Sequence, residues 1–255
     1  MANRYFEFRD VSKSFGDNAV LKHVNFQVEQ GETAVIMGRS GVGKSVSLKL
    51  LLGFLEPDAG QIVVAGKDVT GWDEDRFAEI RRRATMVFQS GALFDSLTVA
   101  ENVAFPLISR GVKIDPDEID RRVKELLEML EVSQFADLLP ADLSTGTKRS
   151  VAIARALADE PEAILYDEPT TMVDPLMAAH ISDLIVRLKK TLHKTAIVVT
   201  HDTHLAKKIA DRVIFLHQGE VGFFGTWPEF EKSSNPVLHN FLQEDQLIPA
   251  LDATA

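Results

Sequence analysis

The sequence contains no cysteine, no surplus of positive charge and no long apolar run. Without cysteine the chain has neither a disulfide framework nor a thiolate metal site, which fits a reducing compartment. Its 28 lysines and arginines are outnumbered by 38 acidic residues, giving a net charge of -10, so its overall field repels a nucleic-acid backbone. We therefore expect no nucleic-acid partner.

The lack of long apolar runs argues against a membrane-spanning helix, which needs roughly 18 such residues. Residues 1–5 also lack the apolar core of a signal peptide. We therefore expect a cytoplasmic chain that acts at a membrane only through a partner. Its 255 residues are enough for one large core, or for one core with an inserted subdomain.

The most informative feature that the sequence does contain is a glycine-rich segment. Residues 38–45 fit the phosphate-loop pattern G-x-x-x-x-G-K-[ST]. An apolar run at residues 34–37 precedes it, as in a buried strand, and four leucines at helical spacing follow it. This order of strand, loop and helix is the context that the pattern requires, so it predicts a nucleoside triphosphate site. The residues predicted to contact the nucleotide there are Gly38, Arg39, Ser40, Gly41, Val42, Gly43, Lys44, Ser45 and Val46.

The residue types in this loop suit phosphate binding. Glycines let backbone amides converge on the phosphates, and the helix N-terminus adds partial positive charge. We expect Lys44 to reach the β and γ phosphates and Ser45 to offer its hydroxyl to Mg2+. A glycine-rich turn with a stray lysine is the competing interpretation, which the matching flanks disfavour.

A second apolar run, residues 163–166, ends in two adjacent acids, Asp167 and Glu168. In an open parallel sheet the ligand lies beyond the carboxyl ends of the strands, so both acids are predicted to lie near the phosphates. We expect Asp167 to hold Mg2+, through water, and Glu168 to polarise the water that attacks the γ phosphate. A plain turn is the alternative, and the shared register with the phosphate loop favours the functional interpretation.

The remaining pattern predicts an α/β fold. The first thirty residues alternate as in an antiparallel β subdomain, whereas later apolar strands separated by amphipathic helices indicate a parallel sheet covered on both faces. Residues 90–158, approximately, form a helical block that looks like an insertion. We predict a nucleotide-binding domain at residues 1–230 and a C-terminal tail at residues 231–255, docked on the same chain by default or on another subunit.

Residues 143–147, Leu-Ser-Thr-Gly-Thr, resemble the LSGGQ signature of ATP-binding-cassette (ABC) ATPases, and the resemblance covers the whole chain except the tail. It implies an ABC-type P-loop NTPase with a RecA-like parallel sheet core. By the same resemblance Gln89 is the glutamine that senses Mg2+ and the membrane partner, and His201 is the switch histidine on the γ phosphate. Asp174 lies in the loop that crosses to the other subunit, and Phe15 stacks on adenine.

The signature departs from the family pattern at two positions. Ser144 and Gly146 keep the hydroxyl and the amide that contact the partner's nucleotide, whereas Thr145 and Thr147 replace glycine and glutamine. A β-branched residue narrows backbone freedom at this helix start, so we expect an altered hydrolysis rate. Lys148 and Arg149 follow the signature. We expect the pair to be solvated by default, and contact of the pair with the partner's phosphates is the alternative.

The resemblance also implies partners. A signature helix cannot face its own phosphate loop, so its N-terminus serves ATP bound on a second copy of the chain, and ATP joins the two in a sandwich homodimer. Hydrolysis then releases the interface and drives an integral membrane permease. In this family the groove near Gln89 receives a short helix of the permease.

Residues 88–103 are similar to the Mla- and Mce-associated ATPases. That resemblance implies phospholipid transport across the bacterial envelope, a periplasmic Mce-domain lipid-binding partner, and a place on the cytoplasmic face of the inner membrane. An ATPase for amino acids or another small solute is the alternative. A soluble ABC-type switch is disfavoured, because such proteins usually carry two cassettes or a long coiled-coil insertion and this chain shows neither. A non-hydrolysing ATP sensor is disfavoured because Glu168 and His201 are intact.

Overall fold

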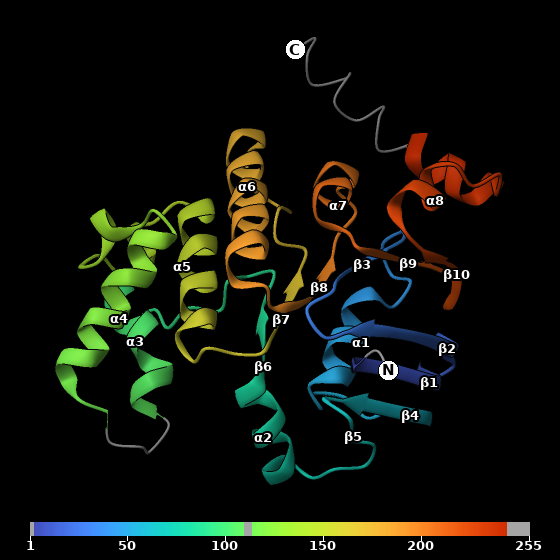
Figure 1. The fold of residues 1–255 in the computed structure, drawn as a ribbon, viewed down its shortest axis with the longest axis horizontal. Coiled ribbons are helices and arrows are strands. Elements are labelled where there is room, and N and C mark those ends of the chain that lie inside the picture. The colour runs from blue at the N-terminus through green and yellow to red at the C-terminus, as the bar shows by residue number, and fades with distance from the viewer. Residues whose placement is uncertain (1–2, 110–113, 244–255) are drawn as a thin grey trace.

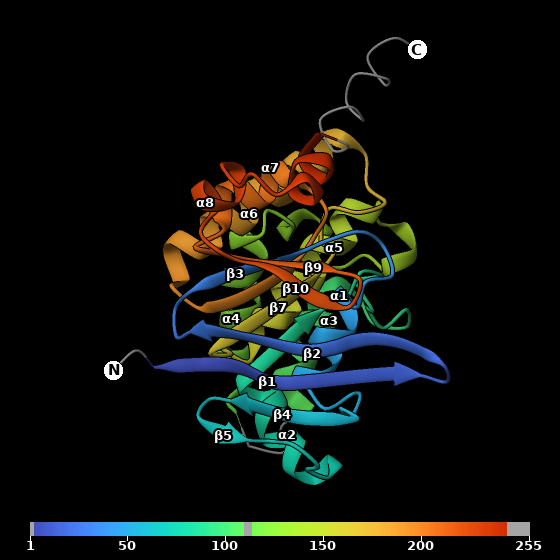
Figure 2. The ribbon, with the colours of Figure 1, turned by 90° about the vertical axis from the view of Figure 1, so that its right-hand side faces the viewer.

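The computed structural model describes residues 3–109 and 114–243, whose strands form two sheets. Figure 1 shows the N-terminal sheet beside the larger sheet that carries β3, and Figure 2 shows the two from the side. Helix α1 (Lys44–Leu51) packs into the core between them, where Leu48, Leu50 and Leu51 are fully buried. The helix that follows the phosphate loop is therefore anchored by both sheets.

The smaller sheet is antiparallel, with strand order β2-β1-β4-β5. In β2 the buried Val24, Phe26 and Val28 alternate with exposed or half-buried residues, as the sequence predicts, whereas residues 5–8 of β1 are all buried. Phe8 stacks on Phe26 with ring centroids 4.5 Å apart. Its strands are β1 (Arg4–Phe15), β2 (Asn18–Glu29), β4 (Ala59–Val64) and β5 (Lys67–Asp68).

The larger sheet has the order β10-β9-β3-β8-β7-β6, and all its pairs are parallel except β10 with β9. Every residue of β3, β7 and β8 is buried, as expected of strands covered on both faces. The strands are β3 (Thr33–Met37), β6 (Ala84–Val87), β7 (Ala163–Asp167), β8 (Thr195–Val199), β9 (Arg212–His217) and β10 (Glu220–Gly225).

Three helices, α3, α4 and α5, lie together on one side of the molecule, at the left of Figure 1. They come between β6 and β7 in the chain, where the sequence predicts the helical block. Asp115 caps α4 by accepting from the amide of Asp117, and Pro116 occupies the first turn. The helices are α2 (Glu74–Arg83), α3 (Val99–Ser109), α4 (Pro116–Met129), α5 (Thr145–Ala158), α6 (Pro175–Leu192), α7 (Thr203–Ile209) and α8 (Trp227–Glu231), with short 3-10 turns at Ser133–Phe135 and Pro140–Asp142.

These observations confirm the predicted fold class, a parallel sheet core with an N-terminal antiparallel subdomain and helices inserted between strands. The domain boundary at residue 230 stays a prediction. Within the tail, Leu238 and Phe241 are buried on the same chain, and the Phe241 ring lies 5.0 Å from that of Phe215. Residues 244–255 lie outside the described residues. Of the helices in residues 3–109 and 114–243, none is long and apolar enough to cross a membrane.

Candidate functional site

The phosphate loop leaves the carboxyl end of β3 and ends where α1 begins. Gly38 and Gly43 have φ angles of 143° and 102°, a region that favours glycine. A Cβ atom on Gly38 would collide with the backbone carbonyl of Leu216, and one on Gly43 would meet the side chain of Leu21. Both glycines are therefore required by the turn and by the close approach of neighbouring segments.

The Lys44 ammonium lies inside the loop. Its Nζ atom donates to the carbonyls of Gly38, at 2.8 Å, and Arg39, at 3.2 Å. It also lies 3.5 Å from Oε1 of Glu168. The buried cation is thus compensated by two carbonyl dipoles and one carboxylate, and it stands between the loop and the end of β7.

Ser45, in the first turn of α1, meets Asp167 at the carboxyl end of β7, where the Ser45 hydroxyl donates to Oδ1 of Asp167 at 2.6 Å. Burial raises the pKa of the Asp167 carboxyl, and the charge of Glu168 adds to this, while the Ser45 hydrogen bond opposes it. A hydroxyl and a carboxylate side by side are the oxygen ligands that Mg2+ prefers. These residues therefore fit a magnesium site completed by phosphate oxygens and water.

Glu168 is the most heavily contacted acid of the site. Its Oε2 atom accepts from the Thr171 hydroxyl at 3.1 Å and lies 2.9 Å from Nδ1 of His201. Burial alone raises the pKa of Glu168, but the hydrogen bond and charge of His201, with the charge of Lys44, outweigh it and lower the pKa. Glu168 is therefore a carboxylate at neutral pH and can accept a proton or a hydrogen bond from water.

A pocket of about 440 Å³ gathers most of the predicted site residues. Phe15 stands at its edge with 47% of its surface exposed, as a ring open to a stacking partner would. Gly38, Arg39 and Val42 belong to the phosphate loop and Asp167 ends β7, but these four residues do not line the pocket itself. Its lining is Phe15, Val20, Ser40, Gly41, Gly43, Lys44, Ser45, Val46, Gln89, Glu168, Thr171 and His201.

Ser144, Gly146 and Asp174 do not line this pocket. Ser144 caps α5 by accepting from the amide of Thr147 at 3.1 Å, and Asp174 caps α6 by accepting from the amide of Met177 at 3.0 Å. Gly146 is buried against the side chain of Met177. Their predicted contact with a nucleotide on a second copy therefore stays a prediction, and their place outside their own pocket agrees with it.

The interpretation of Arg149 as part of a solvated pair is wrong, because its side chain is neither solvated nor directed at the surface. It is 3% exposed and donates to the carbonyls of Phe88, at 2.9 Å, and Thr171, at 3.3 Å. The sequence analysis missed both Arg149 and Thr171. A hydroxyl three residues after Glu168 is a local signal that could have indicated Thr171, whereas the pattern of charges around Arg149 indicates solvent.

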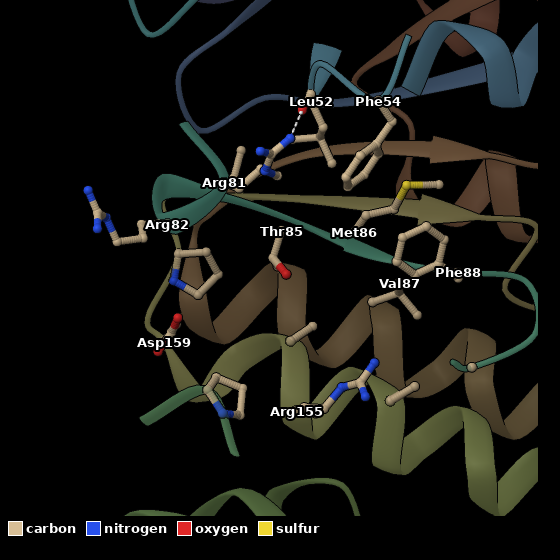
Figure 3. A pocket seen from close by; sticks show the side chains of 16 residues that line it. Leu52, Phe54, Arg81, Arg82, Thr85, Met86, Val87, Phe88, Arg155 and Asp159 are labelled. Atoms are coloured by element: carbon tan, nitrogen blue, oxygen red, sulfur yellow. Dashed lines mark hydrogen bonds between the residues drawn. The ribbon is translucent and has the colours of Figure 1, made fainter. Parts of the chain in front are cut away.

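A second cavity, of about 210 Å³, lies between β6 and α5 (Figure 3). Phe54, Met86 and Phe88 give it apolar walls, and Arg81 and Arg155 approach it from opposite sides of the strand. The Arg81 guanidinium donates to the carbonyl of Leu52 at 3.0 Å. Arg155 lies 5.5 Å from the ring of Phe94, and its burial lowers the pKa of its guanidinium.

Comparison with known sequences finds a match to a family model described as ABC transporter over residues 21–171. The methionine import ATP-binding protein MetN of Brucella abortus is 40% identical over 97% of this chain. The chain spans 66% of the length of that relative, just under two thirds. The chloroplastic protein TRIGALACTOSYLDIACYLGLYCEROL 3 of Arabidopsis thaliana is 38% identical over 92% of this chain and 72% of its own length.

Comparison with solved structures finds the ATP-binding cassette MJ0796, solved as a dimer in a post-hydrolysis state bound to ADP and Pi. It is 36% identical, with a TM-score of 0.79 over 87% of this chain and 98% of that chain. The match to the family model, over residues 21–171, covers both the phosphate loop and the segment of Ser144. The fold of this chain is therefore that of an ATP-binding cassette.

Proposed function

This chain belongs to the ABC transporter family, and from that premise we propose that it is the ATP-hydrolysing subunit of an ABC transporter. As a cassette of this family it uses ATP with Mg2+ and is an ATPase. The observation that carries the proposal is the convergence of Lys44, Ser45, Glu168 and His201 on one pocket.

We assign each of these residues a part in hydrolysis. Amides of the phosphate loop and the Lys44 ammonium bind the β and γ phosphates, and Phe15 stacks on the base. The Glu168 carboxylate accepts a hydrogen bond from the attacking water, while His201 holds that carboxylate and reaches the γ phosphate. Ser45 and Asp167, with Gln89 of the same site, would hold Mg2+, which would neutralise charge on the phosphates.

We further propose that two copies close around ATP. Ser144 is exposed at the N-terminus of α5 and lies outside its own chain's pocket, so its hydroxyl can reach a nucleotide held by a second copy. The dimeric structure of the 36% identical cassette supports this arrangement. Glu168→Gln should bind ATP without hydrolysing it and migrate as a dimer on gel filtration, whereas a variant that stays monomeric with ATP would contradict the sandwich.

The recipient of the motion is proposed to be an integral membrane permease, with this chain peripheral on the cytoplasmic face of the membrane. The cavity of Figure 3 supports this, because Phe88, the residue before Gln89, lines it. Its other walls include β6 and the helices α3 and α5 of the insertion. Its apolar walls suit the side chains of a short helix. A movement of Gln89 that is driven by the nucleotide would therefore be transmitted to this cavity.

For the cargo, the comparisons favour a small solute. The methionine importer at 40% identity supports an amino-acid-type importer, which uses a substrate-binding protein as its partner. The resemblance to Mla ATPases and the Mce-domain partner receive no support from it. A lipid cargo remains the second candidate, because residues 88–103 resemble that group and one relative, 38% identical, carries the name of a galactolipid.

Two experiments test the proposal. Lys44→Ala should abolish ATP binding while the circular dichroism spectrum stays that of the wild type, and Lys67→Ala, which changes an exposed lysine paired with Glu79, should hydrolyse ATP normally. Undiminished turnover in Lys44→Ala would contradict the assigned site. Purification from native membranes then decides the cargo, because an amino-acid-binding protein in the complex supports the small solute and an Mce-domain protein supports lipid.

A further inference from the structure

Arg149 is a buried cation placed on the helix that begins with the signature. It lies one turn beyond the N-cap Ser144 and points into the protein, with 3% of its surface exposed. Arginine is rarely buried to this degree unless specific partners compensate its charge. The groups that compensate the charge of Arg149 therefore indicate the role of this side chain.

The guanidinium reaches two segments that are far from it in sequence. Nη1 donates to the carbonyl of Phe88, 61 residues away and directly before Gln89. Nη2 donates to the carbonyl of Thr171, 22 residues away in the other direction. Thr171 in turn is bound to Glu168 twice, through its amide at 3.2 Å and its hydroxyl at 3.1 Å.

Backbone carbonyls, rather than a carboxylate, receive these hydrogen bonds. Burial lowers the pKa of Arg149, while the charge of Asp167 favours its protonated form. Its Nε atom has no acceptor among the described residues. The charge therefore depends on the two carbonyls, and if either segment moved away alone, a buried donor would lose its partner, which is unfavourable.

A second contact joins the same helix to the same region. Gly146, three residues before Arg149, packs against Met177 in the first turn of α6 so closely that a side chain would not fit. The segment between Glu168 and α6 is thus held to α5 at two points, through Thr171 in its middle and through Met177 just beyond its end. Neither contact depends on the other.

We propose that Arg149 is a positioning residue that makes the Gln89 segment, the segment from Glu168 to Thr171, and the signature helix move as one unit. This inference rests on the proposed function. In the proposed function Gln89 lines the nucleotide pocket, next to Phe88 of the cavity proposed for the permease. Glu168 serves the chain's own ATP, and Ser144 serves the ATP of the second copy. A rearrangement at any one of the three is transmitted to the other two through the guanidinium.

The first test compares Arg149→Gln and Arg149→Lys with the wild-type full chain. Glutamine has a single amide nitrogen and lysine a single ammonium, so neither spans both carbonyls as the guanidinium fork does. We expect kcat to fall about tenfold or more, which corresponds to about 1.4 kcal/mol, with ATP affinity within about threefold of wild type. Arg122→Gln is the matched control, because it breaks an ion pair with Glu160 between α4 and the end of α5 without touching either loop.

Thermal unfolding of each variant separates positioning from stability. A kcat per folded molecule within about twofold of wild type in both Arg149 variants would overturn the inference. So would a matching loss of kcat in Arg122→Gln at equal loss of Tm, because the role would then be merely structural. If the wild type itself failed to hydrolyse ATP, the proposed function would fall instead.

A second test follows the segments directly and needs no turnover. In a Glu168→Gln background, added ATP should slow amide hydrogen exchange in residues 86–92 and 170–174 together. Adding Arg149→Gln should leave the second segment protected by ATP and the first as mobile as without nucleotide. Equal protection of both segments in that double variant would contradict the coupling, even where the kinetic result agreed with it.

Discussion

A Cβ atom added to Gly146 would lie 2.7 Å from the sulfur of Met177, and closer still to its Cγ atom. Gly146 does not have a positive φ angle, so the backbone itself would accept an alanine there. We therefore predict that Gly146→Ala destabilises the chain by about 1–3 kcal/mol through overpacking. It should also displace the start of α5, lowering ATP-dependent dimerisation measured by gel filtration.

The contact with Met177 can be tested by rescue. Met177→Ala removes the obstructing side chain, so the double variant should regain most of the Tm that Gly146→Ala loses. Gly222→Ala is a suitable control, because Gly222 also lacks a positive φ angle and its nearest neighbour would be 3.4 Å away. A double variant no more stable than Gly146→Ala would mean that something other than Met177 requires the glycine.

We predict that Asp167→Asn stabilises the chain in the absence of nucleotide while abolishing Mg2+-dependent hydrolysis. Burial raises the pKa of Asp167, so its charged form destabilises the fold at neutral pH. The gain should be largest at neutral pH and should shrink as pH falls through the raised pKa. Thermal unfolding measures it, with about 2–4 °C expected for each kcal/mol relieved, and a lower Tm for the variant at pH 7 would contradict it.

Much of the site could be predicted because its signals are local in sequence. The phosphate loop carries its own strand, turn and helix start, and Asp167 and Glu168 end an apolar strand whose parallel pairing brings them to the same sheet edge. Asp115 and Pro116, a capping residue followed by a proline, likewise indicate the start of α4. In each case the residues that define the structure are neighbours in the chain.

Arg149 could not be predicted for the opposite reason. Its acceptors are backbone carbonyls, which every residue has, and they lie 61 and 22 residues away. A charged residue beside Lys148 at the start of a helix indicates a solvated face, and only the fold shows that two loops enclose it. The need for glycine at position 146 is similar, because it depends on a methionine of another helix.

We predict that Thr145→Gly raises the ATPase rate of the dimer. Thr145 is the first residue of α5, exposed, and lies near Lys49, Gln89 and Met172 at the nucleotide face. Its branched side chain occupies space at the helix N-terminus that would approach the γ phosphate on a second copy. The rate should rise about two- to tenfold at saturating ATP, for an expected stability cost of up to about 1 kcal/mol.

The measurement is steady-state hydrolysis as a function of chain concentration. In the proposed sandwich dimer Thr145 lies at the other copy's nucleotide, so the gain should appear only at chain concentrations where the chain associates. Thr70→Gly offers a control at a threonine remote from the nucleotide pocket. An unchanged maximal rate in Thr145→Gly would remove the idea that this side chain restrains closure.

Asn102 should be important for the loop beside the cavity of Figure 3. It is fully buried, accepts from the amide of Phe94 at 2.8 Å, and donates to the carbonyls of Phe94, Leu97 and Thr98 at 2.9–3.0 Å. Asn102→Leu keeps the branched shape of the side chain but leaves these groups unpaired, so we predict a loss of about 1–3 kcal/mol or more. Faster amide exchange at residues 94–98 would accompany it, whereas Asn25→Leu, at an exposed position, should change stability little.

The pair formed by His201 and Glu168 predicts a dependence of stability on pH. The His201 hydrogen bond and charge, acting against burial, lower the pKa of Glu168, so the pair stabilises the fold above the unfolded pKa of about 4.3 and loses that contribution as pH falls through the lowered value. His201→Ala should therefore be less stable than wild type in urea unfolding at pH 6, and the difference should shrink below about pH 4. His23→Ala breaks a similar pair with Asp10 that is largely exposed, so its effect should stay within about 1 kcal/mol. Equal losses in the two variants at pH 6 would mean that burial gives the Glu168 pair no special weight.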